Sequence, residues 1–325
     1  MAADILSFLT SGEWVSGEEM AETLGISRAA VWKQIQSLRQ RGYEISASTR
    51  KGYRLAKDPD LLDEDRICCS LKTKWLGRDM RILAKVSSTN EVALSLARDC
   101  PNGTVILAET QTRGRGRLSR TWASPPGGIW MSLILKPEMP LAQVYQINMA
   151  VAVAVCKAIS SSFGLEAGIK WPNDLLIKER KICGILMEVS AQVDRLDYAV
   201  VGLGLNANID PSGFPAEWRS TSLAAELDHD ISRCELICRI LEEIEVAFER
   251  MGSQEIYEEW RSRSLTLKRQ VRITSAAGDL VGEVVDLAED GALLLLSGDE
   301  QKRILAGDCI HLRSADAKGI VSRGP

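Results

Sequence analysis

An arginine-rich loop is the first stretch of this sequence whose residue types could do chemistry. It reads ETQTRGRGRLSRTW and spans residues 109–122. Four arginines lie within it: Arg113, Arg115, Arg117 and Arg120. Gly114 and Gly116 let backbone N–H groups approach a ligand closely, and guanidinium groups form charge-assisted hydrogen bonds with anions. The loop therefore predicts an anion site with phosphate as the first candidate; a merely solvated basic loop is the alternative.

A second stretch, KWPND at Lys170–Asp174, places a cation, an indole, an amide and a carboxylate side by side. Two other motif matches fail on their context. GLGLNA (Gly202–Ala207) fits the dinucleotide pattern G-x-G-x-x-A, which must open a helix, but it runs into the turn-forming residues 208–211. QTRGRG (Gln111–Gly116) fits a loop of acyl-CoA N-acetyltransferases that caps a helix, whereas this one leads to an expected strand. We therefore set both matches aside.

Length and composition bound the class of protein. The chain has 325 residues, 45% of them apolar and 26% charged, which suits a soluble protein of two or three domains. Eight cysteines occur without a C-x-x-C pair and beside only two histidines, so we expect free thiols rather than a zinc site. No run of eighteen apolar residues occurs, and the start of the sequence lacks the pattern of a secretory leader, so we expect neither a membrane span nor a leader. We expect a cytoplasmic protein.

Positive charge is concentrated near the start of the chain. Residues 27–54 carry seven basic residues and one acid, although the net charge of the whole chain is -4. Helix signals cover Asp4–Thr10 and Ser16–Leu24, a polar helix follows up to Gly42, and residues 43–55 alternate as a hairpin. This order predicts a winged helix-turn-helix that binds DNA, with a protein-docking module as the alternative. The side chains expected at DNA are Ser27, Arg28, Lys33, Gln34, Arg50 and Lys51.

Strands and helices mix in the central part of the chain. We expect strands over 103–110, 129–135, 167–177, 181–189 and 197–209 and helices over 141–160 and 232–251. The pattern predicts an α+β domain with a mixed or largely antiparallel sheet. The last fifty residues alternate in short strands broken at Ala277, Asp290 and Gly298, which predicts a small β barrel. The expected divisions are a winged helix (1–56), a linker (57–66), the central domain (67–266) and the β domain (267–325).

Five stretches, taken in order, resemble one family. They are SSTNEV (87–92), QTRGRGRLSRTW (111–122), KWPNDLLI (170–177), KICGILMEV (181–189) and VGLGLNANI (201–209). With the winged helix in front, residues 4–313 resemble the biotin protein ligases, in particular the bifunctional bacterial type that is also the biotin operon repressor. The resemblance implies a central domain similar to class II synthetases and an SH3-like C-terminal barrel.

The resemblance also implies a reaction in two steps. The biotin carboxylate attacks the α-phosphate of ATP, and a lysine of a biotin carboxyl carrier protein then takes the biotinyl group. No protein nucleophile is needed, but charge must be neutralised where two anions meet. Lys181, Arg115 and Arg117 are the implied catalytic groups. Mg²⁺ at Asp174, a homodimer when the adenylate is bound, and operator DNA complete the implied set of ligands and partners.

Further ligand contacts follow from the same resemblance. Those implied for biotin are Ser88, Thr89, Asn90, Gln111, Gly114, Arg115, Gly116, Arg117, Lys181 and Gly184. Those implied for ATP or the adenylate are Arg117, Trp122, Lys170, Asn173, Asp174, Lys181 and Asn206. The chain departs from the family pattern at Leu118 and Ser119, where a basic residue and a glycine are usual. We expect catalysis to survive this change and place the doubt on loop closure and its coupling to dimerisation.

Three alternatives remain open at this point. The catalytic domain could belong to a lipoate-type acyl ligase, which substrate competition would distinguish. The chain could be a sensor of a small acid without turnover, against which Lys181, Arg115 and Arg117 argue. The ligase could also carry an N-terminal domain that no longer binds DNA, and nothing in one sequence decides this.

Overall fold

The structure is a computed structural model, and it describes residues 5–9, 12–40, 42–57, 60–275 and 278–312. The chain divides into two compact units, residues 1–69 and 70–325. The described residues leave out Asp4 and Thr10, which we expected at the two ends of a helix. They also leave out Ala277, which we expected in a turn. The end of the last expected domain, after residue 312, lies outside them too.

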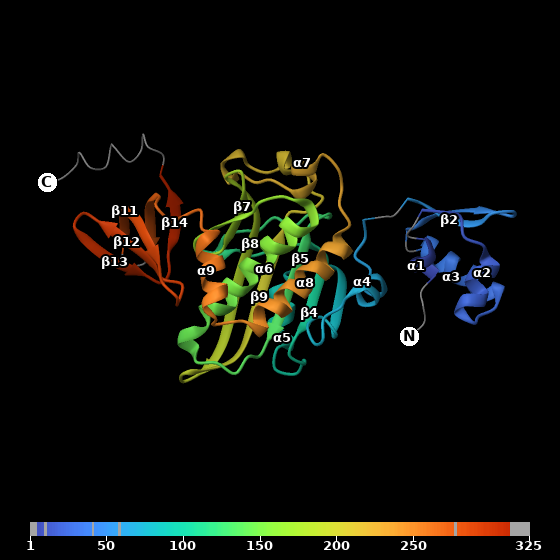
Figure 1. Ribbon diagram of the computed structural model, residues 1–325, viewed down its shortest axis with the longest axis horizontal. Helices are drawn as coiled ribbons and strands as arrows, with labels where there is room; N and C mark the ends of the chain where they lie inside the picture. Colours follow the sequence, from blue (N-terminus) through green and yellow to red (C-terminus); the bar gives the residue numbers. More distant parts are fainter. Residues whose placement is uncertain (1–4, 10–11, 41, 58–59, 276–277, 313–325) are drawn as a thin grey trace. The chain divides into compact units, whose positions relative to one another are not determined.

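The N-terminal unit has three short helices followed by a hairpin (Figure 1). Its elements are α1 (Ile5–Leu9), α2 (Gly17–Leu24), α3 (Arg28–Gln40), β1 (Glu44–Ser48) and β2 (Gly52–Lys57). The Ser16 hydroxyl caps α2 by accepting from the Glu18 N–H, and Gly25, at φ 65°, ends the helix. Val31, Ile35 and Leu38 turn inward from α3. The order of elements is the one predicted for a winged helix.

The segment expected as a linker is partly packed. Helix α4 (Glu64–Ser70) begins inside it. Leu62 and Asp63 are buried, and the Tyr43 hydroxyl donates to Asp63 Oδ2 at 2.8 Å, so this stretch lies against the N-terminal unit. The four domain limits remain predictions.

The second unit is built on a seven-stranded mixed sheet, as predicted. Its order is β3-β4-β5-β9-β8-β7-β6, and only β3 and β4 are parallel. The bounds are β3 Met80–Val86, β4 Thr104–Gln111, β5 Ile129–Leu135, β6 Gly168–Lys170, β7 Asp174–Ile177, β8 Arg180–Gln192 and β9 Arg195–Leu205. The single strand expected over 167–177 is wrong. It is two antiparallel strands, because Pro172 has no N–H for a sheet and the chain bends there.

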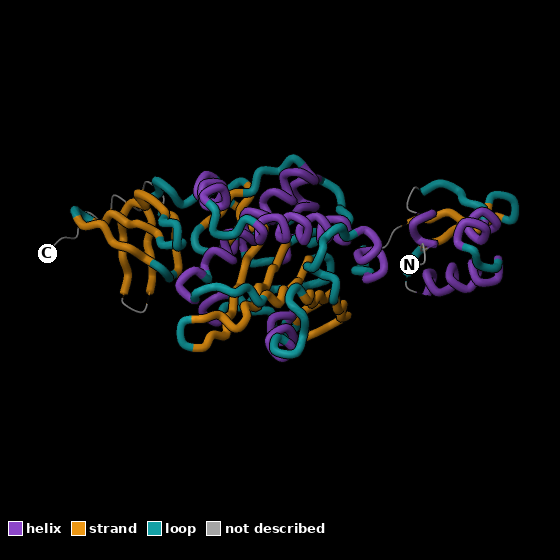
Figure 2. Tube along the Cα trace, turned by 60° about the horizontal axis from the view of Figure 1, so that its bottom comes forward, coloured by secondary structure: helices purple, strands orange, loops and turns teal. Residues whose placement is uncertain are grey.

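Helices cover both faces of this sheet (Figures 1 and 2). Helices α6 (Tyr145–Phe163) and α8 (Arg233–Glu249) lie on one face, and α5 (Thr89–Leu96) packs on the other against β4, β5 and β9. Every residue of β5 is buried, since its side chains alternate between two covered faces. The first four residues of GLGLNA end β9 and the motif opens no helix, so the dinucleotide interpretation fails.

Among the described residues, the stretch Leu141–Phe163 is long and apolar enough to cross a membrane by length and composition. Twelve residues of α6 are buried in the protein, so the helix serves as a core element.

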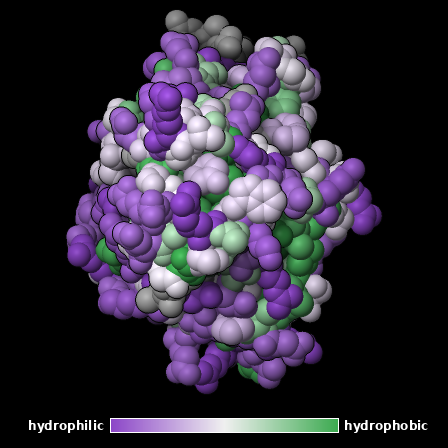
Figure 3. Space-filling model, turned by 90° about the vertical axis from the view of Figure 1, so that its right-hand side faces the viewer, coloured by the Kyte–Doolittle hydropathy of each residue, from purple (hydrophilic) through white to green (hydrophobic). Residues whose placement is uncertain are grey.

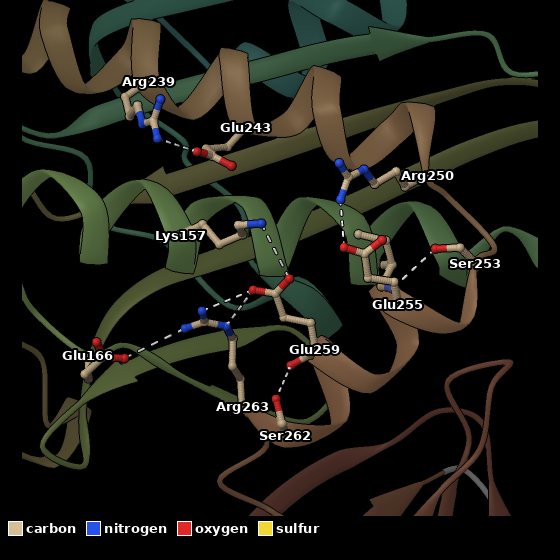
Figure 4. A network of polar contacts seen from close by, with 11 residues as sticks. Lys157, Glu166, Arg239, Glu243, Arg250, Ser253, Glu255, Glu259, Ser262 and Arg263 are labelled. Carbon is tan, nitrogen blue, oxygen red and sulfur yellow. Dashed lines mark hydrogen bonds and ion pairs between the residues drawn. The ribbon is translucent and has the colours of Figure 1, made fainter.

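An ion pair joins helix α9 (Gln254–Ser262) to α6. Figure 4 shows Glu259 between two cations: it lies 3.6 Å from Lys157 Nζ and 3.2 Å from Arg263 Nη2.

All eight cysteines are free thiols, as expected, and six are buried. Burial raises the pKa of the Cys309 thiol to about 12, and it raises that of Cys183 well above the ordinary value. These thiols therefore stay protonated at neutral pH and pack as small apolar side chains.

The C-terminal sheet is antiparallel but open. Its order is β13-β12-β11-β10-β14, with bounds β10 Gln270–Ser275, β11 Gly278–Leu287, β12 Leu293–Ser297, β13 Glu300–Ile304 and β14 Asp308–His311. Within residues 270–275 and 278–311 the edge strands β13 and β14 do not pair with each other. The closed SH3-like barrel is thus not present in the described part of the chain. The alternation of apolar and polar residues predicted the strands, but it carries no information on whether a sheet closes into a barrel.

The turn before β12 docks this sheet onto the central domain. The indole N–H of Trp171, in KWPND, donates to Gly291 O at 2.9 Å. Gly291 has φ 85°, and a Cβ there would lie 1.8 Å from Cδ1 of Tyr145. A glycine is needed twice over, for the backbone conformation and for the close approach of the ring.

Gly291→Ala should lower the free energy of unfolding by about 3 kcal/mol, from left-handed strain together with overpacking. Gly298→Ala is the matched control, because Gly298 also has positive φ (63°) but nothing within 4 Å of its Cβ position. Left-handed strain alone should cost that variant about 1 kcal/mol. Urea unfolding of both variants checks this, and equal losses would show that the contact with Tyr145 contributes nothing.

Candidate active site

A cavity of about 740 Å³ opens on the face of the sheet that carries α5. Of the ligand-binding residues predicted from the sequence, all but Gly114 line it: Ser88, Thr89, Asn90, Gln111, Arg115, Gly116, Arg117, Trp122, Lys170, Asn173, Asp174, Lys181, Gly184 and Asn206. The structure therefore brings five separate stretches of the sequence to one place.

One end of the cavity is a buried network of uncharged groups. The start of α5 supplies Thr89 and Asn90, whose side chains are nearly inaccessible. The Thr89 N–H donates to Gln111 Oε1 at 2.8 Å. Ser132 Oγ lies 2.7 Å from Thr89 Oγ1 and 2.6 Å from Asn90 Oδ1. Because buried polar groups are held firmly when all are partnered, this end is a preorganised hydrogen-bonding surface for a neutral polar ring.

Arg115 meets two carboxylates beside that network. Its Nη2 is 3.6 Å from Glu188 Oε1, and its Nε is 3.8 Å from Glu91 Oε1. The Ser87 hydroxyl donates to Glu91 and, with Arg115 and Arg113, holds the pKa of this carboxyl below its ordinary value. Glu188 also accepts from Asn90 Nδ2 at 2.9 Å. The charge of Arg115 is thus compensated where a neutral ring would lie.

Lys181 is set at the other end by a β-bulge. Pairing of β7 with β8 shifts between Leu175 and Leu176, which face Cys183 and Lys181, so Ile182 is an extra residue on β8. The bulge interrupts the alternation of side chains, and Ile182 and Cys183 are both buried while Lys181 stays at the cavity. The register between β7 and β8 therefore places the Lys181 side chain at the cavity, and the sequence alone does not show this.

The ammonium group of Lys181 has two contacts. Nζ is 2.7 Å from Asp174 Oδ1 and 4.9 Å from the centre of the Trp122 ring. Asp174 holds the cation in the cavity until an anion competes for it. The Trp122 indole N–H is buried without a hydrogen-bond partner, which is costly, so a donor is available here.

Three glycines leave room above this face of the sheet because they carry no side chain. Gly184 and Gly204 are directly paired on β8 and β9, and the Trp122 ring lies above them: Cβ atoms there would be 3.0 Å from Cζ3 and 2.5 Å from Nε1. Gly202 faces Asn90 in the same way, with its Cβ position 2.2 Å from Oδ1. The space over Gly184, expected for biotin, holds the indole in this structure.

The arginine loop is a narrow hairpin. The Trp122 N–H donates to Gly114 O, and the Gly116 N–H donates to Arg120 O, both at 2.8 Å. Gly114 is required because a Cβ would lie 2.4 Å from Trp122 O, whereas the Gly116 N–H is used inside the loop rather than offered to a ligand. Leu118 and Ser119 at the tip have φ 53° and 58°. Leucine in this conformation costs about 1 kcal/mol, and the family's glycine at the second position would remove some of the strain.

The C-terminal sheet closes one side of the cavity. Arg117 Nη1 donates to Asn173 Oδ1 at 3.3 Å, and Nη2 donates to Gly307 O at 3.1 Å. Arg120 makes two hydrogen bonds to Asp308, and its Nη1 lies 3.0 Å from Oδ1. Burial lowers the pKa of His311, on the same strand as Asp308, to about 4, so this imidazole is neutral at pH 7. Two of the four loop arginines are thus held by the neighbouring sheet.

Asn206 supports the segment that follows β9. Its Nδ2 donates to Thr221 O at 2.9 Å, and the Thr221 N–H donates to Lys181 O at the same distance. The Lys181 N–H donates to Arg219 O at 2.7 Å. The backbone of Lys181 is therefore fixed from both sides, and Asn206 acts on it through Thr221.

Sequence reasoning missed Ser132, Glu188 and Glu91. Ser132 is fully buried and is the single polar residue of the strand IWMSLIL, which is a signal that could have been used. Glu188 is the last residue but one of the motif KICGILMEV and faces the cavity side, two residues beyond Leu186. Ser132 and Glu188 were hidden because their partner Asn90 is 42 and 98 residues away in the chain, whereas Glu91 stands inside the motif SSTNEV.

Ser132→Ala should weaken biotin binding roughly tenfold and lower stability by about 1–2 kcal/mol, because Thr89 and Asn90 each lose a buried partner. Calorimetric titration and urea unfolding measure the two effects. Ser190→Ala on β8, which removes a longer 3.4 Å contact to Asp197, is the control. It should change biotin affinity by no more than about twofold and the free energy of unfolding by no more than about 0.5 kcal/mol. Unaltered biotin affinity in Ser132→Ala would remove Ser132 from the site.

The predicted DNA-binding residues lie together in the N-terminal unit. Arg28, Lys33 and Gln34 are exposed on α3, and Arg50 and Lys51 are exposed at the turn between β1 and β2. The Ser27 hydroxyl accepts from the Ala30 N–H at 3.1 Å and caps α3. Two other basic residues of this region serve the fold instead. Arg39 donates to Ile45 O, and Arg54 stacks 5.1 Å from the Trp14 ring centre.

Comparisons with known proteins agree with this geometry. Three family models match: Biotin/lipoate A/B protein ligase family over residues 83–206, HTH domain over 2–54, and Biotin protein ligase C terminal domain over 266–312. The bifunctional ligase/repressor BirA of Bacillus subtilis is 39% identical over 307 residues, which cover 91% of this chain and 93% of that protein. This chain belongs to the biotin protein ligase family.

Other biotin protein ligases are similar along the whole length or over the catalytic part. The bifunctional ligase/repressor BirA of Escherichia coli is 29% identical over 96% of this chain and 97% of its own. The structure of the Aquifex aeolicus biotin protein ligase in complex with biotin and ATP superposes with a TM-score of 0.63 at 30% identity, covering 73% of this chain and all of that one. The similarity to the bifunctional biotin protein ligases therefore includes the winged helix.

Proposed function

We propose that this protein joins biotin to a lysine of a biotin carboxyl carrier protein through biotinyl-5′-adenylate, and that it represses transcription of the biotin operon when the adenylate is bound. The observation that carries the proposal is the cavity itself. A neutral, fully hydrogen-bonded surface lies at one end of it, and Lys181, Arg117 and Lys170 lie at the other. This arrangement suits a ligand with a polar uncharged ring and a carboxylate that must meet a phosphate.

In the first step, an oxygen of the biotin carboxylate attacks the α-phosphorus of ATP, and the bond to the β-phosphate oxygen breaks to release pyrophosphate. The reactants repel each other, and negative charge builds on the phosphoryl oxygens. Lys181 is held at the cavity by backbone contacts on both sides and is placed to offset this charge. Arg117, oriented by Asn173, is placed to do the same from the loop.

In the second step, the amine of the carrier lysine attacks the carbonyl carbon of the mixed anhydride. The amine loses a proton, the C–O bond to the phosphate breaks, and AMP leaves. No protein side chain has to form a covalent bond, so the main contribution of the chain is to position the adenylate and stabilise charge. Trp122 offers a flat ring for the adenine and an unpartnered N–H.

Mg²⁺ fits the site only together with the nucleotide. No group of three or more His, Cys, Asp or Glu side chains suited to a metal occurs among the described residues. Mg²⁺ is commonly held by one or two carboxylates plus substrate phosphates, and Asp174 is the carboxylate in place for that. When bound, the ion would screen the phosphate charges, while Asp174 would give up its pairing with Lys181.

The regulatory part of the proposal rests on the N-terminal unit. Its exposed basic side chains on α3 and on the hairpin suit the major groove and the phosphates of duplex DNA. We propose a homodimer when the adenylate is bound, because two winged helices would then meet two operator half-sites. Adenylate and DNA would each favour that dimer by linkage. A cytoplasmic location is part of the same proposal.

The deciding experiment is calorimetric titration with biotin, then with biotin and MgATP, with pyrophosphate measured in the same sample. Binding of biotin with one pyrophosphate released per chain is the expected result. Biotin binding without pyrophosphate would leave a sensor without turnover. Preference for lipoate over biotin in competition would move the protein to a lipoate-type acyl ligase.

A further inference from the structure

We propose that Trp32 reads the DNA sequence, and that its indole packs on the methyl group of a thymine in the major groove. The inference rests on the repressor part of the proposed function and deepens it by naming a residue and the chemical group that it recognises.

Trp32 lies outside the hydrophobic core of the N-terminal unit. It is 54% exposed on α3. It belongs neither to the buried core of the described residues of this unit nor to the half-buried side chains packed on that core. The face of the molecule drawn in Figure 3 carries mostly hydrophilic side chains. Leaving so much apolar area in water gains nothing on folding.

The neighbours of Trp32 match DNA. Arg28 precedes it by four residues and Gln36 follows it by four, so the three side chains share one face of α3. Lys33 is adjacent and exposed, and α3 has no acidic residue. A cationic helix face with hydrogen-bonding groups is complementary to duplex DNA, whose phosphates dominate the attraction.

An isolated apolar side chain also points to a base rather than to a protein. From the start of α1 to the end of β2, Trp32 is the single exposed large apolar side chain among the described residues; the other one in this unit, Leu61, lies after the hairpin. Protein-binding sites usually present a contiguous apolar patch. In the major groove, by contrast, the one apolar group at a base edge is the thymine C5-methyl. Arginine and glutamine read guanine and adenine there, so Arg28 and Gln36 leave the methyl group to Trp32.

The experiment uses the full chain with biotin and MgATP and duplexes selected from a random-sequence library by the wild type. Each thymidine of the selected site is then replaced singly by deoxyuridine, which removes only the methyl group. We expect Trp32→Ala to bind the selected duplex roughly tenfold more weakly and a scrambled duplex within about twofold of the wild type. At one thymidine, deoxyuridine should weaken the wild type about fivefold and the variant not at all, because the methyl group has already lost its contact.

Lys33→Ala is the matched control. Loss of a phosphate contact should weaken binding to both duplexes. It should also reduce the slope of the logarithm of affinity against the logarithm of salt concentration by about one. A thermal unfolding curve with the same transitions as that of the wild type verifies that the N-terminal unit of Trp32→Ala is folded, and unchanged pyrophosphate release verifies that the catalytic site is intact. Equal affinity of Trp32→Ala and the wild type for the selected duplex would overturn the proposal, and so would equal losses on both duplexes or a deoxyuridine effect that survives in the variant. In each of those cases the wild type still selects a site and the repressor function stands. If the wild type enriches no sequence, the repressor function fails, and this inference with it.

Discussion

Lys181→Gln is expected to slow formation of biotinyl-5′-adenylate about a thousandfold while leaving biotin affinity within roughly tenfold of the wild type. Glutamine keeps most of the side-chain length but removes the charge that offsets the two approaching anions. Stability should change little, since Asp174, which loses its partner at 2.7 Å, is partly exposed and can take up water. Single-turnover release of pyrophosphate, with biotin affinity from calorimetry, separates the rate effect from binding.

Two variants sharpen this result. Lys178→Gln is the matched control: Lys178 lies in the turn before β8, pairs with Glu226 at 3.1 Å and does not line the cavity. It should adenylate biotin at a rate within about twofold of the wild type. Lys181→Arg keeps the charge but changes its shape, and it should recover part of the rate. If Lys181→Gln retained more than a tenth of the wild-type rate, Lys181 would not be the electrostatic catalyst.

The members of the cavity were predictable from the sequence where each is part of a compact motif. Asn90, Arg117 and Lys181 sit within short stretches whose residue types suit anions and polar rings, and the family resemblance implied that they meet. Their supporting partners were not predictable. Ser132 and Glu188 reach Asn90 from strands that are 42 and 98 residues away in the sequence. Alternation shows which side of a strand a residue takes, but not which neighbour it finds there.

Features that depend on register and closure were also out of reach. The bulge at Ile182 changes the face of every later residue on β8, and a single sequence does not contain the pairing that creates it. Trp171 of KWPND is buried, yet its N–H holds the C-terminal sheet through Gly291, which lies 120 residues away in the sequence. Within the described residues the C-terminal sheet is open because its edge strands β13 and β14 do not pair with each other. The alternation of residues within a strand does not predict which strands pair.

Gly202→Ala is expected to weaken biotin binding on the order of a thousandfold, because a polar site that loses its hydrogen-bonding geometry rejects its ligand strongly. The new methyl carbon would lie 2.2 Å from Asn90 Oδ1 and 2.8 Å from its Cγ. Asn90 cannot yield easily, since Ser132, Glu188 and Leu186 O hold it within 2.6–3.3 Å. Overpacking should also lower the free energy of unfolding by about 2 kcal/mol. Calorimetric titration with biotin and urea unfolding measure both effects.

The glycine and the asparagine should act as one unit. Gly213→Ala is the control for the substitution itself, because nothing lies within 4 Å of that Cβ position and its φ is negative, and it should bind biotin like the wild type. Asn90→Ala removes the side chain that the new methyl group strikes. If the clash is the cause, Gly202→Ala combined with Asn90→Ala binds biotin no more weakly than Asn90→Ala alone. Additive losses would instead mean that Gly202 is needed for contact with biotin itself, and that the backbone of β9, rather than Asn90, sets the depth of the cavity.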